Sequence, residues 1–217
     1  MARSDPAGSS GSSVSGSAYG RDAQRYDART AVYDLYRRRA VDLLPVARGQ
    51  TVADVGCGTG LCFERLVERV GPEGCVIGVE PAHEMRRLAA QRIAAHGWSN
   101  VVLVASDVES AVLPAVDHAL FCAVHDVLQS PAALDNVVAA LGDGGTVVAA
   151  GGKWAPAWAV AFNAGVLALH APFVRDFAGF SRPWALLAER VPALTVEEVA
   201  LGAGFVASGR VRRTTSA

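Results

Sequence analysis

Apolar and polar positions follow a regular rhythm through the middle of the chain. Short apolar runs end in glycine or in a charged residue, and each run is followed by a longer segment whose apolar positions recur three or four residues apart. The runs predict buried strands at 51–55, 75–79, 101–105, 116–123 and 146–150. Strands that alternate with helices in this way predict a parallel sheet with right-handed crossovers.

The last part of the chain departs from this rhythm. Segments 194–201 and 205–212 are separated by a glycine-rich turn and predict two antiparallel strands, although a final helix over 195–203 is an alternative. The fold class that follows is α/β, a Rossmann-like doubly wound sheet of about seven strands. Most strands are parallel, the C-terminal pair forms an antiparallel hairpin, and helices cover both faces.

The segment 51–60, TVADVGCGTG, predicts a strand that enters a turn with three glycines, Gly56, Gly58 and Gly60. Glycines let a ligand approach the main chain closely, and the helix that begins after the turn offers free amide groups. The third glycine of a dinucleotide fingerprint is replaced by Leu61. Asp54 would repel a pyrophosphate but could hold the ammonium group of an amino-acid-like ligand.

The residues DVGCGTG resemble the first motif of the class I S-adenosylmethionine-dependent methyltransferases. The resemblance covers roughly Tyr26 to Ala150, and it implies S-adenosyl-L-methionine as cofactor and S-adenosyl-L-homocysteine as product. It also implies cofactor contacts from the motif residues, Asp54, Gly56, Cys57, Gly58 and Gly60. AQRYD at 23–27 resembles the aromatic N-terminal segment of small-molecule methyltransferases, so Tyr26 either closes the cofactor pocket or packs its helix onto the sheet.

Further site residues are predicted where strands end. Glu80 follows the strand 75–79, and a carboxylate there can accept hydrogen bonds from both ribose hydroxyls, the alternative being a surface acid. In the family, an acid after the third strand accepts from the adenine amino group, which Asp107 matches. The resemblance also places other side chains against the cofactor: Pro81, Met85, Val108 and Val124. Met85 can equally be plain core.

His125 follows the strand 116–123, at the sheet edge where Asp54, Glu80 and Asp107 also converge. Imidazole can take a proton near neutral pH, so His125 is a candidate general base. It could instead bond only to the backbone or to the cofactor carboxylate. His170 is a second, less constrained candidate.

Segment 151–192 is rich in Trp and Phe and predicts a lid over the acceptor substrate, with a helix over 155–171. The predicted substrate-binding residues are Trp154, Trp158, Phe162 and His170. The alternatives are a helical layer packed on the sheet or a homodimer surface through 154–184.

Composition restricts the partners and the compartment. A net charge of −1 and a pI near 6.5 give no reason to expect a nucleic-acid partner. No apolar run is long enough to span a membrane and no apolar signal core is present, so we expect a soluble, cytoplasmic protein. The cysteines show no C-x-x-C pair, and we expect reduced thiols with no metal or disulfide.

The residues after the fourth strand, Val124 to Val127, lack the acid-or-asparagine, proline, proline, aromatic pattern of amino-methyltransferases. They also lack the clustered acids and lysine of the metal-dependent catechol type. We therefore expect metal-independent methyl transfer to oxygen, nitrogen or carbon of a small, fairly apolar metabolite. Two alternatives stay open: an NAD(P)-dependent oxidoreductase and a non-catalytic methyltransferase-like partner protein.

The predicted domain plan is a Ser/Gly-rich disordered tail followed by a single domain over 21–217. The tail covers 1–20. The expected parts of the domain are an N-terminal helical cap at 21–48, a cofactor-binding half at 51–150, the aromatic lid at 151–192 and the C-terminal strands at 194–212.

Overall fold

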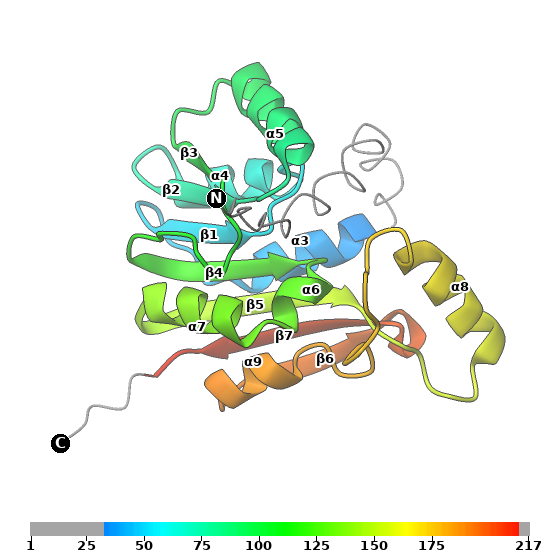
Figure 1. The fold of residues 1–217 in the computed structure, drawn as a ribbon. Helices are drawn as coiled ribbons and strands as arrows, with labels where there is room; N and C mark the ends of the chain where they lie inside the picture. The colour runs from blue at the N-terminus through cyan, green and yellow to red at the C-terminus, as the bar shows by residue number, and fades with distance from the viewer. Residues whose placement is uncertain (1–32, 213–217) are drawn as a thin grey trace, which may run out of the picture.

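The computed structural model describes residues 33–212. The predicted tail at 1–20 and the candidate Tyr26 lie outside these residues. A seven-stranded sheet crosses the molecule in the order β3-β2-β1-β4-β5-β7-β6 (Figure 1). Its strands are β1 (Thr51–Val55), β2 (Cys75–Val79), β3 (Val101–Val104), β4 (Val116–Cys122), β5 (Leu141–Gly152), β6 (Thr195–Val199) and β7 (Gly204–Arg210).

The sheet changes its direction of winding beside β1. Strand β1 pairs in parallel with β2 on one side and with β4 on the other, so the order reverses between β1 and β4. Strand β7 pairs antiparallel with both β5 and β6. The expected C-terminal hairpin is thus confirmed, and the alternative helix over 195–203 is wrong. Ligands bind at such a reversal, outside the carboxyl ends of the strands.

Two helical layers bury the two faces of the sheet (Figure 1). One face packs on α3 (Asp34–Leu43), α4 (Phe63–Val70) and α5 (His83–His96). The other packs on α6 (His125–Leu128), α7 (Pro131–Ala140) and α9 (Ala185–Arg190). Helix α8 (Val160–His170) lies at one end of the molecule. The predicted α/β class with helices on both faces is confirmed.

Side chains of β1 alternate between these layers. Val52 belongs to the apolar cluster with α3 and α4, whereas Ala53 and Val55 belong to the cluster with α7. Because successive strand residues point to opposite faces, Asp54 shares the face of Val52. Its carboxyl group is therefore buried under α3 rather than pointing at solvent.

Local sequence explains where the helices begin and end. Ser130 caps α7 by accepting a hydrogen bond from the Ala133 amide at 3.2 Å, and Pro131 occupies the first turn, where its missing N–H costs nothing. Helix α5 ends at Gly97, which adopts φ +67° in the left-handed region. Both ends follow the usual rules for helix boundaries.

Two predicted boundaries are wrong. The helix expected from residue 155 begins only at Val160, because the Asn163 side chain bonds to the Ala155 amide at 2.9 Å and to the Ala155 carbonyl at 3.2 Å, which holds the preceding residues in a turn. The strand expected at 146–150 begins five residues earlier, at Leu141, which pairs with Val116 before the register shifts.

No helix within residues 33–212 combines the length and the apolar character needed to cross a membrane.

Candidate active site

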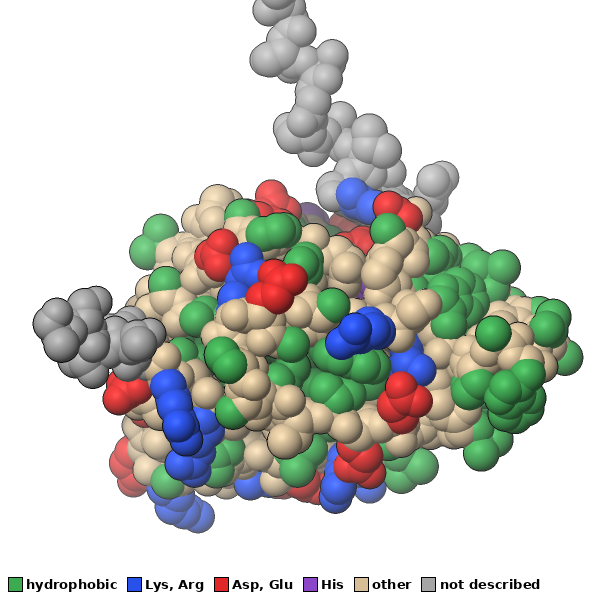
Figure 2. Space-filling view, turned by 90° about the horizontal axis from the view of Figure 1, so that it is seen from below, with side chains coloured by type: hydrophobic (Ala, Val, Ile, Leu, Met, Phe, Trp, Pro, Cys, Tyr) green, Lys and Arg blue, Asp and Glu red, His purple; other side chains and the backbone are tan. Residues whose placement is uncertain are grey.

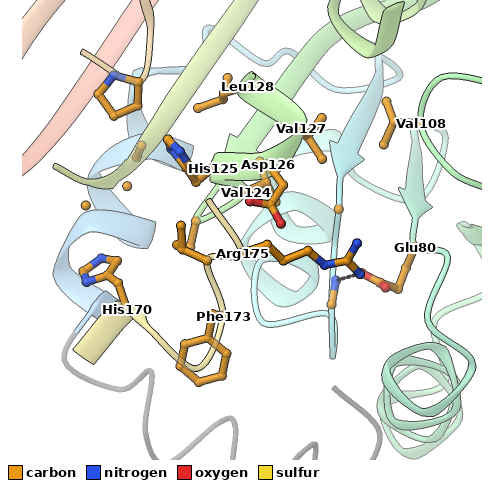
Figure 3. A pocket seen from close by; sticks show the side chains of 18 of the residues that line it. Glu80, Val108, Val124, His125, Asp126, Val127, Leu128, His170, Phe173 and Arg175 are labelled. Carbon is orange, nitrogen blue, oxygen red and sulfur yellow. Dashed lines mark hydrogen bonds between the residues drawn. The ribbon is translucent and has the colours of Figure 1, made fainter. Parts of the chain in front are cut away.

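A cavity of about 330 Å³ opens at the carboxyl ends of the central strands. Figure 3 shows Glu80 and Val108 at one side of this cavity and His170 and Phe173 at the other, with His125 and Asp126 between them. The residues that follow β1, β2, β3 and β4 thus meet in one place although they are far apart in the sequence. Eight of the predicted cofactor residues line it: Gly56, Gly58, Glu80, Pro81, Met85, Asp107, Val108 and Val124.

The glycine turn after β1 forms one wall. Gly56 adopts φ +67°, and a Cβ at this position would lie 2.6 Å from Cγ1 of Val124. Gly60 adopts φ +78°, and a Cβ there would lie 2.5 Å from the ring of Phe63, so a larger residue would also collide at this position. Cys57 lies behind the turn, where its amide donates to the Val79 carbonyl at 3.0 Å. The turn therefore presents bare backbone to the cavity.

Glu80 ties this turn to the end of β2. Its Oε2 accepts from the Gly58 amide at 3.1 Å, and its Oε1 accepts from the Ala82 amide at 2.8 Å. Burial raises the pKa of the Glu80 carboxyl, while the two amide hydrogen bonds and the Arg86 guanidinium oppose the rise. Each oxygen keeps a lone pair for a further donor, as binding a vicinal diol requires.

Asp54 is buried beneath the same turn. The residue is 1% exposed, and its Oδ2 has no hydrogen-bond partner among residues 33–212. Burial raises the pKa of this carboxyl to about 7, the nearby Arg37 guanidinium opposes the rise, and Glu80 adds to it. A buried acceptor with no donor is the group that a bound cation or amine would satisfy. The structure places Asp54, Cys57 and Gly60 behind the cavity wall rather than in it.

His125 occupies the start of α6, immediately after β4. Its Nε2 lies 3.1 Å from the Ala178 carbonyl oxygen and must donate to it, so Nδ1 carries the lone pair of the neutral ring. Nδ1 is enclosed and has no partner within residues 33–212. The ring packs edge-on against Phe180 with centroids 5.0 Å apart. His125 therefore fastens the segment after α8 to the end of β4.

His170 faces the same cavity from the end of α8. Its Nδ1 donates to the Val166 carbonyl at 3.0 Å, and its Nε2 lies 2.9 Å from the hydroxyl oxygen of Tyr33. Burial lowers the pKa of His170, the hydrogen bond to the Val166 carbonyl opposes this, and the nearby His125 side chain adds to the lowering. Burial raises the pKa of the Tyr33 hydroxyl. Both side chains are therefore neutral at neutral pH.

Two of the predicted substrate-binding residues do not reach the cavity. Trp158 is 84% exposed and Phe162 is 45% exposed, and neither belongs to the wall that the described residues form. Trp158 lies in the turn before α8, and α8 itself buries only Val166, which leaves Phe162 on its open side. His170 alone of the four lines the cavity.

Trp154 stands one layer behind the wall. It stacks on Phe177 with ring centroids 5.2 Å apart and meets Phe180 edge-on at 5.1 Å. Phe180 is 1% exposed and lines the cavity, so Trp154 supports the wall without forming it. The aromatic richness of segment 151–192 indicated this packing, but it could not say which ring faces inward.

Sequence reasoning missed several wall residues, among them Tyr33, Asp126, Gly152, Phe173, Arg175 and Phe180. Burial raises the pKa of the Asp126 carboxyl. The Arg175 charge and a hydrogen bond from the Arg175 backbone amide oppose this rise. Figure 3 shows the Arg175 side chain close to Asp126. Gly152 could have been predicted as a site residue from the sequence, because it ends β5 and the other predicted site residues also lie where strands end.

The described residues hold no group of three or more His, Cys, Asp or Glu side chains that could bind a metal ion. The four cysteines are free thiols, two of them buried.

Comparison with known proteins assigns the central part of the chain to a family. Residues 52–145 match the family model described as a methyltransferase domain. The chain is similar to aklanonic acid methyltransferase DauC of Streptomyces sp. (strain C5), with 31% identity over 119 residues, which is 51% of this chain and 54% of that protein. It is 37% identical over 78 residues to nocamycin O-methyltransferase of Saccharothrix syringae, 36% of this chain and 28% of that protein.

The chain thus spans about half or less of the length of these curated relatives. Among solved structures, a SAM-dependent methyltransferase from Aquifex aeolicus is similar with a TM-score of 0.64 and 18% identity, over 88% of this chain and 98% of that one. The likeness in structure supports the fold, and the segment 52–145 matched by the family model contains the glycine turn, Glu80 and Asp107.

Proposed function

We propose that this chain, whose residues 52–145 form a class I S-adenosylmethionine-dependent methyltransferase domain, transfers a methyl group to a hydroxyl oxygen of a small, fairly apolar metabolite. The observation that carries the proposal is the cavity, in which a cofactor-type wall and an aromatic wall with two histidines face each other. Two similar proteins are named for methylating natural products, and one of them is an O-methyltransferase. No metal is part of the proposal.

The residues present fit the cofactor. The bare backbone at Gly56 allows close approach, Glu80 offers free lone pairs, and the buried Oδ2 of Asp54 lacks a donor. We assign ribose binding to Glu80, adenine binding to Asp107 with Val108 and Met85, and the amino-acid end to the turn below which Asp54 lies. When bound, S-adenosylmethionine supplies an electrophilic methyl group on a sulfonium. The chain then has to orient the acceptor and exclude water.

The acceptor wall combines apolar rings with a few polar groups, as small-molecule sites do. It comprises Tyr33, His125, His170, Phe173, Phe180 and Phe205. Two histidines of this wall are candidates to receive the proton of an acceptor hydroxyl. The role of His125 as the base stays a prediction, and its enclosed Nδ1 would have to gain access to the acceptor.

Calorimetry with S-adenosylhomocysteine tests the cofactor assignment, and we expect saturable binding in the micromolar range. Transfer from isotopically labelled S-adenosylmethionine to a panel of hydroxylated, amino and carbon acceptors then tests the acceptor class, with hydroxylated apolar molecules labelled preferentially. No heat with either cofactor form, from protein shown to be folded by circular dichroism, would contradict the proposal. Cofactor binding without transfer to any acceptor would favour the non-catalytic alternative.

The oxidoreductase alternative loses support because the matched family model and both relatives are methyltransferases. A change in nicotinamide absorbance with candidate alcohols would restore it.

We further propose a homodimer through the aromatic 154–184 region. Exposed apolar side chains gather around α8 at one end of the molecule (Figure 2), namely Trp158, Val160, Phe162 and Leu167. We expect light scattering to show a dimer that Phe162→Ser with Leu167→Ser converts to monomer. Val112 is 90% exposed elsewhere, so Val112→Ser is the matched control and should leave the dimer intact. A monomer in the unmodified protein would contradict the proposal.

A further inference from the structure

The cavity holds a hydrogen-bonded pair that the cofactor assignment does not use. Tyr33, just before α3, and His170, at the end of α8, are 137 positions apart in the sequence, and the Tyr33 hydroxyl oxygen lies 2.9 Å from Nε2 and 3.3 Å from Nδ1 of His170. Both side chains are part of the cavity wall. Two distant segments are thus brought together by polar groups at the place where the acceptor binds.

The backbone fixes the direction of this hydrogen bond. His170 Nδ1 is 3.0 Å from the Val166 carbonyl, which can only accept, so Nδ1 carries the proton and Nε2 carries the lone pair. The Tyr33 hydroxyl must therefore donate to Nε2. The lone pairs of its oxygen are left to accept from another hydroxyl group.

Packing fixes the position of the imidazole as well. A Cβ on Gly152, the last residue of β5, would lie 1.9 Å from Nε2 of His170, so only glycine leaves room for the ring there. On its other side the ring meets Phe180 edge-on, with centroids 5.2 Å apart. The ring is therefore confined between the sheet and the aromatic wall.

Among residues 33–212, two titratable groups act on the pair. Tyr36 acts on Tyr33 from α3, with ring centroids 6.3 Å apart, and His125 acts on His170 from α6. Burial favours the neutral imidazole, so Nε2 keeps a lone pair that can accept a proton.

We propose that Tyr33 is a catalytic residue that receives the proton of the acceptor hydroxyl while it passes its own phenolic proton to Nε2 of His170. This inference rests on the proposed function and assigns its base to the pair rather than to His125. The O–H bond of the acceptor and the O–H bond of Tyr33 break. A new O–H bond forms on the Tyr33 oxygen, and a new N–H bond forms on Nε2 of His170. The acceptor oxygen uses the freed electron pair to bond the methyl carbon as the carbon–sulfur bond breaks, with that bond's pair staying on sulfur.

The relay predicts an effect that depends on the acidity of the acceptor. Phenolic acceptors whose pKa lies well above the assay pH need the relay, whereas acceptors already ionised do not. We expect Tyr33→Phe to lower kcat about 100-fold or more for the first group, within the range for general base catalysis, and to leave the second group nearly unchanged. The dissociation constant for S-adenosylhomocysteine stays the same. His170→Gln, which removes the final proton acceptor, should reproduce the pattern.

Tyr36→Phe is the matched control, since Tyr36 is a half-buried neighbour on α3 that lies outside the described cavity wall. It should turn over un-ionised and ionised acceptors at the same relative rates as the unmodified protein. Gly152→Ala should displace the His170 ring and so reproduce the selective loss of kcat for un-ionised acceptors. A Tyr33→Phe enzyme that is slowed equally for all acceptors, or not at all, overturns the relay. A selective loss of kcat for un-ionised acceptors in His125→Gln alone would assign the proton to His125 instead.

A measurement on the protein without cofactor or acceptor separates this inference from the proposed function. Nitrogen-15 spectra of histidine-labelled protein should show His170 with a protonated Nδ1 and a hydrogen-bonded, unprotonated Nε2. Tyr33→Phe should shift the Nε2 signal and leave the Nδ1 signal, and Tyr36→Phe should shift neither. If the unmodified protein transferred no methyl group, the proposed function would fail while these spectra still reported on the pair. If Tyr33→Phe leaves the Nε2 chemical shift of His170 unchanged, the relay is overturned.

Discussion

Gly56→Ala is expected to weaken binding of S-adenosylhomocysteine at least 100-fold. The new methyl group would lie 2.6 Å from Cγ1 of Val124, and the residue would have to keep φ +67°, which costs a side-chain-bearing residue about 1 kcal/mol or more. The turn must therefore shift, and the close approach of a ligand to its backbone is lost. Calorimetry with S-adenosylhomocysteine measures the effect.

Gly97→Ala provides a close control for backbone strain. Gly97 has the same φ of +67° at the end of α5, but a Cβ there meets no described atom within 4 Å. We expect this variant to lose about 1 kcal/mol of stability and to bind the ligand normally. Adding Val124→Ala to Gly56→Ala removes the colliding atom and should restore part of the affinity. Binding by Gly56→Ala within about threefold of the unmodified protein would show that the turn does not hold the cofactor.

Asp54→Asn is expected to change how stability depends on pH. The folded protein holds the pKa of Asp54 at about 7, above the ordinary value of about 3.9 in an unfolded chain. Between these values the folded state binds more protons than the unfolded state, so the free energy of unfolding falls as pH rises. The shift of about three units corresponds to about 4 kcal/mol, which is present below pH 4 and lost above pH 7.

Urea unfolding at pH 5, 6, 7 and 8 measures this slope, which should be much shallower in Asp54→Asn. At pH 8 the variant should be the more stable protein, because it no longer buries an ionised carboxylate. Asp42 is an exposed acid paired with Arg69, and Asp42→Asn should change stability by less than about 1 kcal/mol at every pH. An unchanged slope in Asp54→Asn would assign the effect to Glu80, whose pKa burial also raises.

The meeting of the predicted cofactor residues in one cavity wall could be foreseen from the sequence because their positions follow local rules. Strand, glycine turn and helix follow each other directly, and Glu80 and Asp107 end strands whose carboxyl ends must meet in a parallel sheet. No pairing had to be known beyond the order of the strands. Burial was harder to foresee, and the enclosure of Asp54 beneath α3 emerges only once the helix is packed on the sheet.

The acceptor wall was less predictable because its contacts are not local. Tyr33 meets His170 across 137 positions, and no periodicity in either segment indicates that contact. Trp158 and Phe162 looked like wall residues because aromatic side chains usually bury. They are instead exposed, Trp158 in the turn before α8 and Phe162 on a helix that buries only Val166. Composition identified the segment correctly as aromatic but did not fix the direction of its side chains.

The division of the cavity between two parts of the sequence has a consequence for how such an enzyme can change. Residues 56–108 supply the wall assigned to the cofactor, while Tyr33 and residues from 150 onward supply most of the opposite wall. The matched family segment ends at residue 145, so Tyr33 and the residues from 150 onward lie outside it. Under the proposed function, substitutions in these outer segments would change the acceptor wall and leave the residues assigned to the cofactor in place. Phe173 is a wall position at which acceptor specificity could be varied, whereas Phe180 also confines the imidazole of His170.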